Sequence, residues 1–450
     1  MSLHASARAS RHSRRPARGV VAVAATTALS ATLLTTTAGA TTQDATMGST
    51  ASISIWAVNQ PGPVNDYMLA LAKSFDSAHP GDKVSVDFIA NTPFKQKILV
   101  AMSAKKPPAL FFSWGGGILQ GYIKAGDVAS LGPTTAAWAS SFLPSSLGAV
   151  TYDNQLWAAP IQGTQPVFFY YNKSVFKKYS LSFPTTWPQL LSVVSTFQKD
   201  GVSSPIILGN LSGWEGLTYL EYLTDRTGGP SVFDAIQSGN HDAWNNPAVI
   251  HALTDIQTLV KAGAFETGYD ALDYGPETDA MVRTGVGAMT LMGDWQISEL
   301  QGEDPSFVTN DLGQAPFPTV PGGKGNAADL EGNTSDYLAV ANDITPAQKA
   351  VAEQFLETEF ETRSFAKTEI AAAQVPVIKG TANLLTGSLS KFLVQIYNWV
   401  GTAPNFQYSW DQALGATRAT PMLTNLSKVF ELSETPQQFV AALDSSSSGV

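Results

Sequence analysis

The sequence predicts an α/β fold, in which strands and helices alternate along the chain. Short apolar segments that alternate with period two, longer segments with helical spacing, and Gly or Pro between them support this prediction. A strand, a helix and a second strand at this spacing form a parallel sheet with right-handed crossovers. With 450 residues, 44% of them hydrophobic, the chain is long enough for two or three domains with true cores.

The first alternating region covers residues 52–131. We expect strands at 52–56, 84–88 and 109–114, and helices at 65–79 and 94–104. Ligands of open α/β sheets bind outside the carboxyl ends of the strands. Residues 56–60 and 114–117 follow two of these strands and are therefore candidates for ligand contact.

The later elements continue the alternation. We expect strands at 167–171, 206–208, 285–292 and within 333–341, and helices from 186, at 248–262, from 345 to about 363 and along the tail at 389–444. Thr186 can cap its helix, and Pro188 suits a first helical turn. Residues 445–450 are expected to form a disordered tail.

The first 40 residues have the features of a secretory signal peptide. Five Arg precede an apolar, Ala-rich run at 19–34, and a small-residue cleavage site ends at Ala40. A membrane anchor is the alternative, but the run is short and rich in Ala and Thr. We expect a signal peptide at 1–40 and a flexible leader at 41–50. The pair Arg14-Arg15 leaves the general secretory and twin-arginine routes open.

The chain after the signal is acidic and contains no cysteine. Residues 41–450 carry 22 basic and 37 acidic residues, a net charge of −15. This charge argues against nucleic acid and against anionic membrane surfaces as partners. The lack of Cys excludes disulfides, thiolate zinc sites and cysteine nucleophiles.

Familiar catalytic and cofactor motifs are missing. The sequence has neither the nucleophile elbow of serine hydrolases nor a glycine-rich phosphate loop. His79, His241 and His251 form no metal-binding pattern. We therefore expect no catalytic residues, no cofactor and no metal site. The many carboxylates leave paired-acid glycoside hydrolysis as an alternative.

The most informative motif is Gly293-Asp294-Trp295, directly after the predicted strand at 285–292. An indole offers a flat apolar face, and a carboxylate accepts hydrogen bonds from hydroxyl groups. A sugar requires both, because it has C–H bonds on its faces and hydroxyls on its rim. The structural alternative is a strand-to-helix junction with a buried Trp.

Other Trp residues also stand beside polar residues or glycine at predicted element ends. These pairs are Trp56 with Asn59, Trp114 with Gly115, Trp214 with Glu215, and Trp410 with Asp411. Aromatic faces with a few placed polar groups are typical of a small-molecule pocket.

Together these features resemble the extracellular solute-binding proteins of carbohydrate ABC importers, the maltose-binding-like family. The markers are 53–56, 111–116, Pro160-Ile161, 170–173, 184–187, 287–295 and Trp410-Asp411. The segment 408–414 is similar to the branch that takes oligosaccharides, such as xylobiose- or raffinose-type binders.

The resemblance implies a type II periplasmic-binding-protein fold, with two α/β lobes joined by hinge crossovers and a sugar in the cleft. It implies an N-lobe at 51–163 plus 337–377 and a C-lobe at 167–333 plus 380–444. The implied ligand contacts are Trp56, Asn59 and Trp114 on the N-lobe, Trp214, Glu215, Asp294, Trp295 and Trp410 on the C-lobe, and Gln165 and Asp336 at the crossovers.

The function implied is that of an exported, monomeric receptor that delivers a short oligosaccharide to ABC permease subunits. It would be extracellular, or associated with the cell envelope (the periplasm in a Gram-negative cell). Gram-positive members usually carry a lipid-modified cysteine, which this chain lacks. A secreted glycoside-active enzyme and a binder of another solute, such as a polyamine, are the alternatives. A cation site needs several convergent carboxylates, and each Trp-bearing loop shows one.

Overall fold

The computed structural model describes residues 50–60, 62–132, 138–240 and 242–447. The predicted signal peptide at 1–40 and residues 41–49 of the predicted leader lie outside the described residues. Among the helices of the described part, none combines the length and the apolar character that a membrane span requires. Two principal sheets carry the architecture.

The first sheet has the strand order β2-β1-β3-β12-β6. Its strands are β1 (Ser52–Val58), β2 (Lys83–Ile89), β3 (Leu110–Ser113), β6 (Ala158–Pro160) and β12 (Tyr337–Val340). The β1 strand pairs in parallel with β2 and β3, as predicted for the first region. The β12 strand joins from far along the sequence and pairs antiparallel with β3 and β6.

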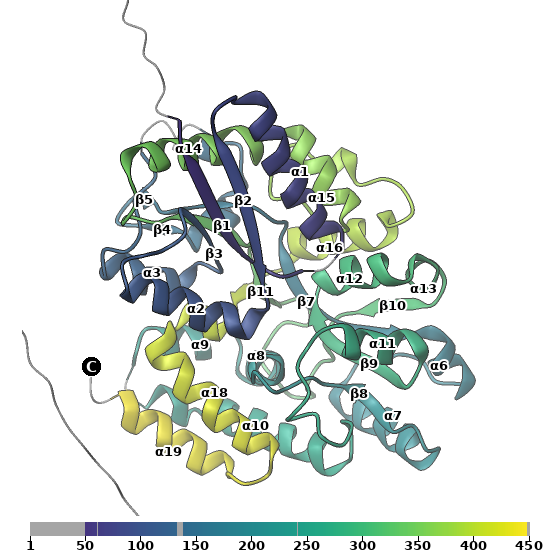
Figure 1. Ribbon diagram of the computed structural model, residues 1–450. Coiled ribbons are helices and arrows are strands. Elements are labelled where there is room, and N and C mark those ends of the chain that lie inside the picture. Colours follow the sequence, from purple (N-terminus) through teal and green to yellow (C-terminus); the bar gives the residue numbers. More distant parts are fainter. Residues whose placement is uncertain (1–49, 61, 133–137, 241, 448–450) are drawn as a thin grey trace, which may run out of the picture. The chain divides into compact units, whose positions relative to one another are not determined.

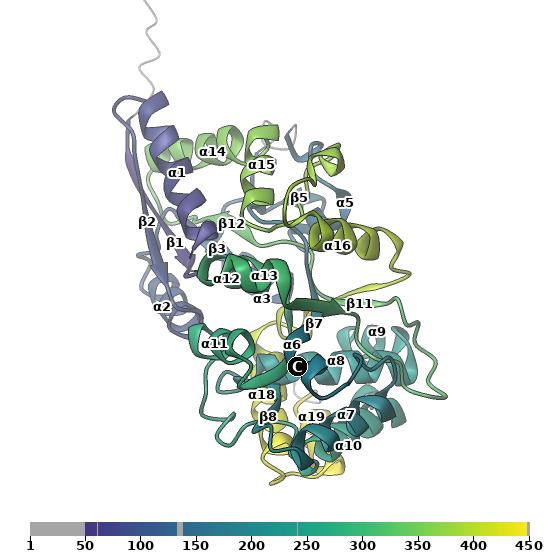
Figure 2. The ribbon, with the colours of Figure 1, turned by 90° about the vertical axis from the view of Figure 1, so that its right-hand side faces the viewer.

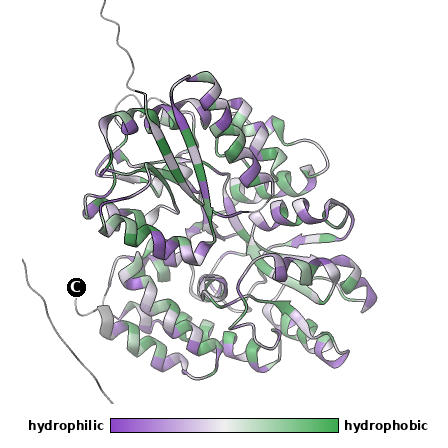
Figure 3. Ribbon diagram, viewed as in Figure 1, coloured by the Kyte–Doolittle hydropathy of each residue, from purple (hydrophilic) through white to green (hydrophobic). Residues whose placement is uncertain are grey.

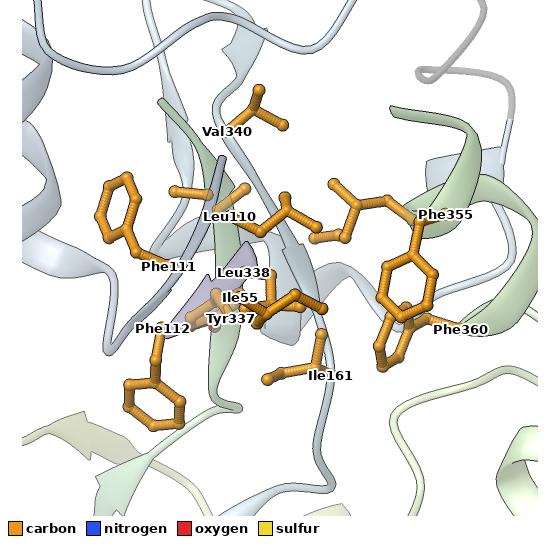
Figure 4. Packing of buried hydrophobic residues seen from close by; sticks show 14 of the residues in the cluster. Ile55, Leu110, Phe111, Phe112, Ile161, Tyr337, Leu338, Val340, Phe355 and Phe360 are labelled. Atoms are coloured by element: carbon orange, nitrogen blue, oxygen red, sulfur yellow. The ribbon is translucent and has the colours of Figure 1, made fainter. Parts of the chain in front are cut away.

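Helices α1 (Pro63–Ala78) and α14 (Pro346–Glu359) pack on this sheet (Figure 1). Its core brings together Ile55, Leu110 and Leu338 from three neighbouring strands, with Phe355 of α14 against them (Figure 4). All four side chains are buried. The further helices here are α2 (Asn91–Ser103), α3 (Gly116–Lys124), α5 (Pro144–Gly148) and α15 (Arg363–Ala371), with a small hairpin of β4 (Thr151–Tyr152) and β5 (Gln155–Leu156).

The second sheet has the order β13-β11-β7-β9-β8, with β10 also paired to β7. Its strands are β7 (Gln165–Asn172), β8 (Ser204–Ile207), β9 (Gly287–Gly293), β10 (Leu312–Ala315), β11 (Leu330–Asn333) and β13 (Phe406–Tyr408). The predicted strands at 167–171, 206–208 and 285–292 are present in it. Every residue of β9 is buried, which explains its unbroken apolar run.

Helices cover the second sheet. They are α6 (Lys173–Lys178), α7 (Trp187–Lys199), α8 (Trp214–Gly228), α9 (Ser231–Gln237), α10 (Pro247–Lys261), α11 (Pro276–Thr284), α12 (Trp295–Glu303), α13 (Pro305–Asn310), α16 (Ser390–Thr402), α17 (Trp410–Ala413), α18 (Ala416–Phe430) and α19 (Pro436–Ser447), with 3₁₀ turns at Ala243–Asn245 and Ala382–Leu384. Figure 3 shows hydrophobic and hydrophilic residues mixed along the helices, as expected where one face meets a core.

Three predictions about helices differ from the structure. The helix predicted from 345 to about 363 ends at Glu359 as α14, and a separate helix, α15, begins at Arg363. The Thr362 side chain accepts a hydrogen bond from the backbone N–H of Phe365 and so caps α15. Within the tail expected to be helical at 389–444, residues Phe406–Tyr408 form the strand β13. Residues 445–447, expected to be disordered, belong to α19, and residues 448–450 lie outside the described part.

Each sheet with the helices packed on it is one lobe, here called the first and the second lobe. Three chain segments connect them: residues 161–164 lead from β6 to β7, residues 334–336 link β11 to β12, and residues 372–389 lead from α15 to α16 (Figure 2). Thr164 and Val375 form a β-bridge, so two of the connections run side by side. A Cβ atom at Gly163 would lie 2.4 Å from the Val375 carbonyl oxygen, so only glycine fits there.

Candidate functional site

A cavity of about 450 Å³ lies between the two lobes, and both lobes line it. The first lobe contributes residues that follow β1 and β3, at the carboxyl ends of two parallel strands. The second lobe contributes the first turns of α8 and α11 and residues along the whole of α12, from Trp295 to Glu303. The cavity therefore lies where ligands of α/β folds usually bind.

On the first lobe, Asn59 and Gln60 line the cavity and Trp56 does not. The reason is that β1 runs two residues further than predicted, to Val58. Trp56 is thereby held within the strand, paired in register with Asp87 and Phe111. Its indole is half-buried, with the Lys97 ammonium 4.0 Å from the ring centroid.

Trp114 lines the cavity from the end of β3. Its ring packs edge-on against Phe94 and Phe112, with centroid distances of 5.9 and 5.0 Å. The Lys95 ammonium lies 5.0 Å from the Trp114 centroid and 3.9 Å from a carboxylate oxygen of Asp411. Lys95 of the first lobe thus lies close to the Trp114 ring of its own lobe and to the Asp411 carboxylate of the second lobe.

Three aromatic rings form the wall on the second lobe. Trp214 lies 5.9 Å from Trp295 and 5.8 Å from Tyr274, measured between centroids. All three line the cavity. Gly293 makes this wall possible, because a Cβ atom there would lie 1.9 Å from a carbon of the Trp295 ring. The glycine of the predicted motif therefore leaves space for the Trp295 indole of the same motif.

The other member of that motif, Asp294, is fully buried and lies outside the cavity lining. It stands at the start of α12 without capping it, and neither carboxylate oxygen has a hydrogen-bond partner among the described residues. Burial raises the pKa of Asp294 well above its usual value, and the nearby Asp336 raises it further.

Trp410 also lies away from the cavity. Its fully buried ring stacks on Phe233 with centroids 4.7 Å apart and packs edge-on against Trp244. Its sequence neighbours Ser409 and Asp411 are the residues that line the cavity. At the start of α17, the hydroxyl of Ser409 and the carboxylate of Asp411 therefore line the cavity. The Trp410 indole between them belongs to the core of the second lobe.

Glu215 lines the cavity from the first turn of α8, next to Trp214. Its side chain is 0% exposed, and neither carboxylate oxygen has a hydrogen-bond partner within the described structure. Burial raises its pKa most, and the Asp273 and Asp411 carboxyl groups raise it further, while the Lys95 ammonium lowers it.

Gln165, the first residue of β7, and Asp336, from the connection between β11 and β12, line the cavity together. The Gln165 amide donates to Asp336 at 2.9 Å and to Gln162 at 2.7 Å. Burial raises the pKa of Asp336 to about 7, although hydrogen bonds from Gln165 and Gln60 lower it. A polar network therefore connects the crossover segments to the cavity.

Several lining residues were missed by sequence reasoning, among them Lys95, Tyr274 and Asp411. Tyr274 precedes Gly275-Pro276, which start α11, and nothing in that local sequence distinguishes it from an ordinary loop residue before a helix. Asp411 was noticed only as the companion of Trp410. Across the described residues, no group of three or more His, Asp or Glu is arranged to hold a metal ion.

Comparisons with known proteins agree with this architecture. An uncharacterized ABC transporter extracellular-binding protein of Pyrococcus horikoshii is 26% identical over 258 residues, which cover 57% of this chain and 58% of that protein. The match therefore spans less than two thirds of that relative.

Solved structures cover more of the chain. One, from a study of xylan utilization by the thermophilic bacterium Caldanaerobius polysaccharolyticus, has a TM-score of 0.80 at 25% identity and covers 88% of this chain and 99% of that one. A chitin oligosaccharide binding protein has a TM-score of 0.80 at 23% identity and covers 89% and 99%. The two-lobe fold expected from the sequence is thus confirmed.

Residues 61–358 match the family model for bacterial extracellular solute-binding proteins, which is about two thirds of the chain. With two lobes, three connections and a lined cavity between them, the chain belongs to the bacterial extracellular solute-binding protein family.

Proposed function

We propose that this protein is an exported receptor that captures a short oligosaccharide in the cavity between its lobes and delivers it to the permease subunits of an ABC importer. The family and the structural relatives consist of extracellular binding proteins. The relative from xylan utilization, at 25% identity, supports a carbohydrate as the solute.

The observation that carries this proposal is the wall of Trp214, Tyr274 and Trp295 opposite polar groups of the first lobe. Aromatic faces bind the C–H faces of a pyranose ring, and side chains such as Asn59 can bond its hydroxyls. The cavity volume also lies within the roughly 300–1,000 Å³ of typical ligand pockets.

We propose ligand contacts for the predicted residues that line the cavity. These are Asn59, Trp114, Gln165, Trp214, Glu215, Trp295 and Asp336. Trp56, Asp294 and Trp410 receive no contact role, because each is packed into its own lobe outside the lining.

We also propose that the lobes move as bodies at 51–163 plus 337–377 and at 167–333 plus 380–444. The separate sheets and the paired connections at Thr164 and Val375 support these boundaries. A ligand that contacts both lobes stabilises the closed arrangement, and so shifts the population towards it.

The remaining parts of the proposal concern the cell. We propose that the protein acts as a monomer without catalysis, and that it works outside the cytoplasmic membrane without a lipid-anchor cysteine. The predicted signal peptide and the absence of Cys from the sequence support this location. The closed form would be the form that the permease recognises.

A thermal-shift screen with neutral mono- and oligosaccharides tests the receptor function. A sugar that binds the native state raises the melting temperature by mass action, with a larger rise at higher concentration. Intact oligosaccharide after long incubation separates a receptor from a glycosidase, which would release reducing sugar. No shift with any sugar would contradict the proposal.

A further inference from the structure

Carboxylates outnumber cations in the lining of the cavity. Among the lining residues that the structure describes, seven carry a carboxyl group, and Lys95 is the one cation. The acids come from α8, the segment 273–279, α12, the connection at 334–336 and α17, and the fold brings them together around one space. A neutral sugar needs hydrogen-bonding groups, but it does not need such an excess of negative charge.

Six of the seven acids have partners within the protein. They are Asp279 with the Gln296 amide, Glu299 with the Tyr274 hydroxyl, Glu303 with Arg283 at 3.3 Å, Asp336 with the Gln165 amide at 2.9 Å, Asp273 with the Ser212 hydroxyl at 3.2 Å, and Asp411 with the Gln412 amide at 2.9 Å and the Ser409 hydroxyl at 3.2 Å. Because these carboxyl groups are hydrogen-bonded within the protein, no ligand is needed to explain their presence in the cavity wall.

Asp273 and Asp411 also affect the seventh acid, Glu215. Both raise the pKa of Glu215, in addition to the larger effect of burial. Lys95 lowers that pKa, but its ammonium is 3.9 Å from Asp411 and also lies over Trp114. Lys95 is therefore already engaged by Asp411 and Trp114.

Glu215 is the member of this group that the protein leaves without a partner. Its side chain is 0% exposed in the cavity wall, and neither oxygen accepts a hydrogen bond from any described residue. A buried carboxylate without a donor costs free energy, which a cationic donor on a ligand offsets best.

We propose that the ligand carries a protonated amino group, which binds at a subsite formed by Glu215, Asp273 and Asp411 beside Lys95. This inference rests on the proposed sugar-binding function and narrows the solute to amino sugars and their short oligomers. The aromatic wall takes the faces of the sugar ring, and the acidic subsite takes its ammonium group. An aliphatic polyamine shares the ammonium chemistry but has no ring faces for that wall.

Calorimetry with matched ligands tests this subsite. We would titrate the full mature chain with glucosamine, galactosamine and the β-1,4-linked glucosamine dimer and trimer, each paired with its N-acetylated form, and with spermidine. The amine form of at least one pair should bind on the order of 10-fold more tightly than its neutral partner, because it makes charge-assisted hydrogen bonds. Spermidine should bind more weakly than that amino sugar.

Two substitutions, one that removes a carboxylate and one that removes an ammonium group, make the test more specific. Glu215→Gln keeps the shape of the side chain and should bring the amine-to-acetyl affinity ratio close to one. Lys95→Met removes the competing ammonium and should increase the ratio. Glu369→Gln is the matched control, because Glu369 in α15 is also 0% exposed with both oxygens unpartnered, but it lies outside the lining. It should leave the ratio unchanged.

Proton release gives an independent readout. An ammonium group beside Glu215 favours its charged form, so binding should release a proton, which calorimetry in two buffers of different ionisation enthalpy detects. Glu215→Gln should abolish the release.

Equal or tighter binding of all N-acetylated forms, no binding of any amine form, or tighter binding of spermidine would overturn the inference. In the first of these cases the receptor function would still stand, whereas a failed screen of all sugars would contradict the receptor function itself.

Discussion

Trp295 and Gly293 illustrate how two positions separated by one residue act together. The glycine ends β9 and has no Cβ atom, so the indole of the first residue of α12 can lie over it. The indole thereby stays half-buried and reaches the cavity beside Trp214. Its place in the wall follows from a missing side chain two positions earlier.

Replacing Trp295 should weaken binding. We expect Trp295→Ala to reduce the affinity for the sugar by about 1–3 kcal/mol, the size of a lost buried aromatic contact. Isothermal calorimetry measures this change. The control is Trp399→Ala, because Trp399 is also half-buried, packs on Phe168 with centroids 4.6 Å apart and lies outside the lining. Unchanged affinity in Trp295→Ala would exclude it as a stacking platform.

Other single positions have a structural role that their sequence context already indicated. Asn172, from the marker 170–173, accepts a hydrogen bond from the Val175 backbone and caps α6. Thr186 forms a capping box with Gln189 at the start of α7, as the Thr-Pro pattern predicted. Such local features can be read from sequence, because the bonding partners are three residues apart.

At the scale of elements, α3 of the first lobe meets α17 and the start of α18 in the second lobe. A Cβ atom at Gly117 would lie 2.6 Å from both the Ala413 carbonyl oxygen and the Gly415 backbone nitrogen. The two backbones approach so closely that only glycine fits. Because the contact joins the lobes at one side of the cavity, it constrains how far they can close.

Gly117→Ala should therefore hinder closure. We expect weaker sugar binding and a larger radius of gyration of the ligand-bound form, because the methyl group pushes two backbones apart. Small-angle scattering with and without sugar, together with calorimetry, measures both effects.

Gly121→Ala in the same helix is the control, since a Cβ atom there meets nothing within 4 Å. It should leave affinity unchanged and stabilise the helix by up to about 1 kcal/mol. If both variants have the sugar affinity and the ligand-bound radius of gyration of the unsubstituted protein, the contact does not limit closure.

At the scale of the whole molecule, buried acids link stability to pH. Burial raises the pKa of Glu221, Asp279 and Asp336 to about 7, and that of Asp225 to about 6. In the unfolded chain these groups lose their protons near pH ~4. Between about pH 4 and 7 the native state holds protons that the unfolded state has released, so stability falls as pH rises through this window.

We expect a higher melting temperature at about pH 5.5 than at about pH 7.5, because each such group contributes up to about 1.4 kcal/mol per pH unit in that window. Differential scanning fluorimetry measures the difference. Asp336→Asn, which removes one titrating group, should reduce it. A melting temperature that rises steadily over this pH range would show that these acids are charged in the native state.

The alternation of elements, the helix caps and the parallel pairing of strands in the first region were predictable from the sequence. They depend on periodicity and on partners a few residues apart, as with Thr186 and Gln189. The resemblance of motifs spread along the chain to a known family implied the two-lobe fold. Seven of the ten predicted contact residues line the cavity.

Only the tertiary structure decided which member of each pair faces the ligand. Asp411 lines the cavity and Trp410 does not, whereas Trp295 does and Asp294 does not. The choice depends on how long β1 runs, on what packs behind each indole, and on contacts across hundreds of residues, such as Lys95 with Asp411. The sequence by itself determined which functional groups are available near the cavity, because these depend on residue type and on local order. Which of these groups lie together depends on contacts between distant segments of the chain, so only the tertiary structure decided that.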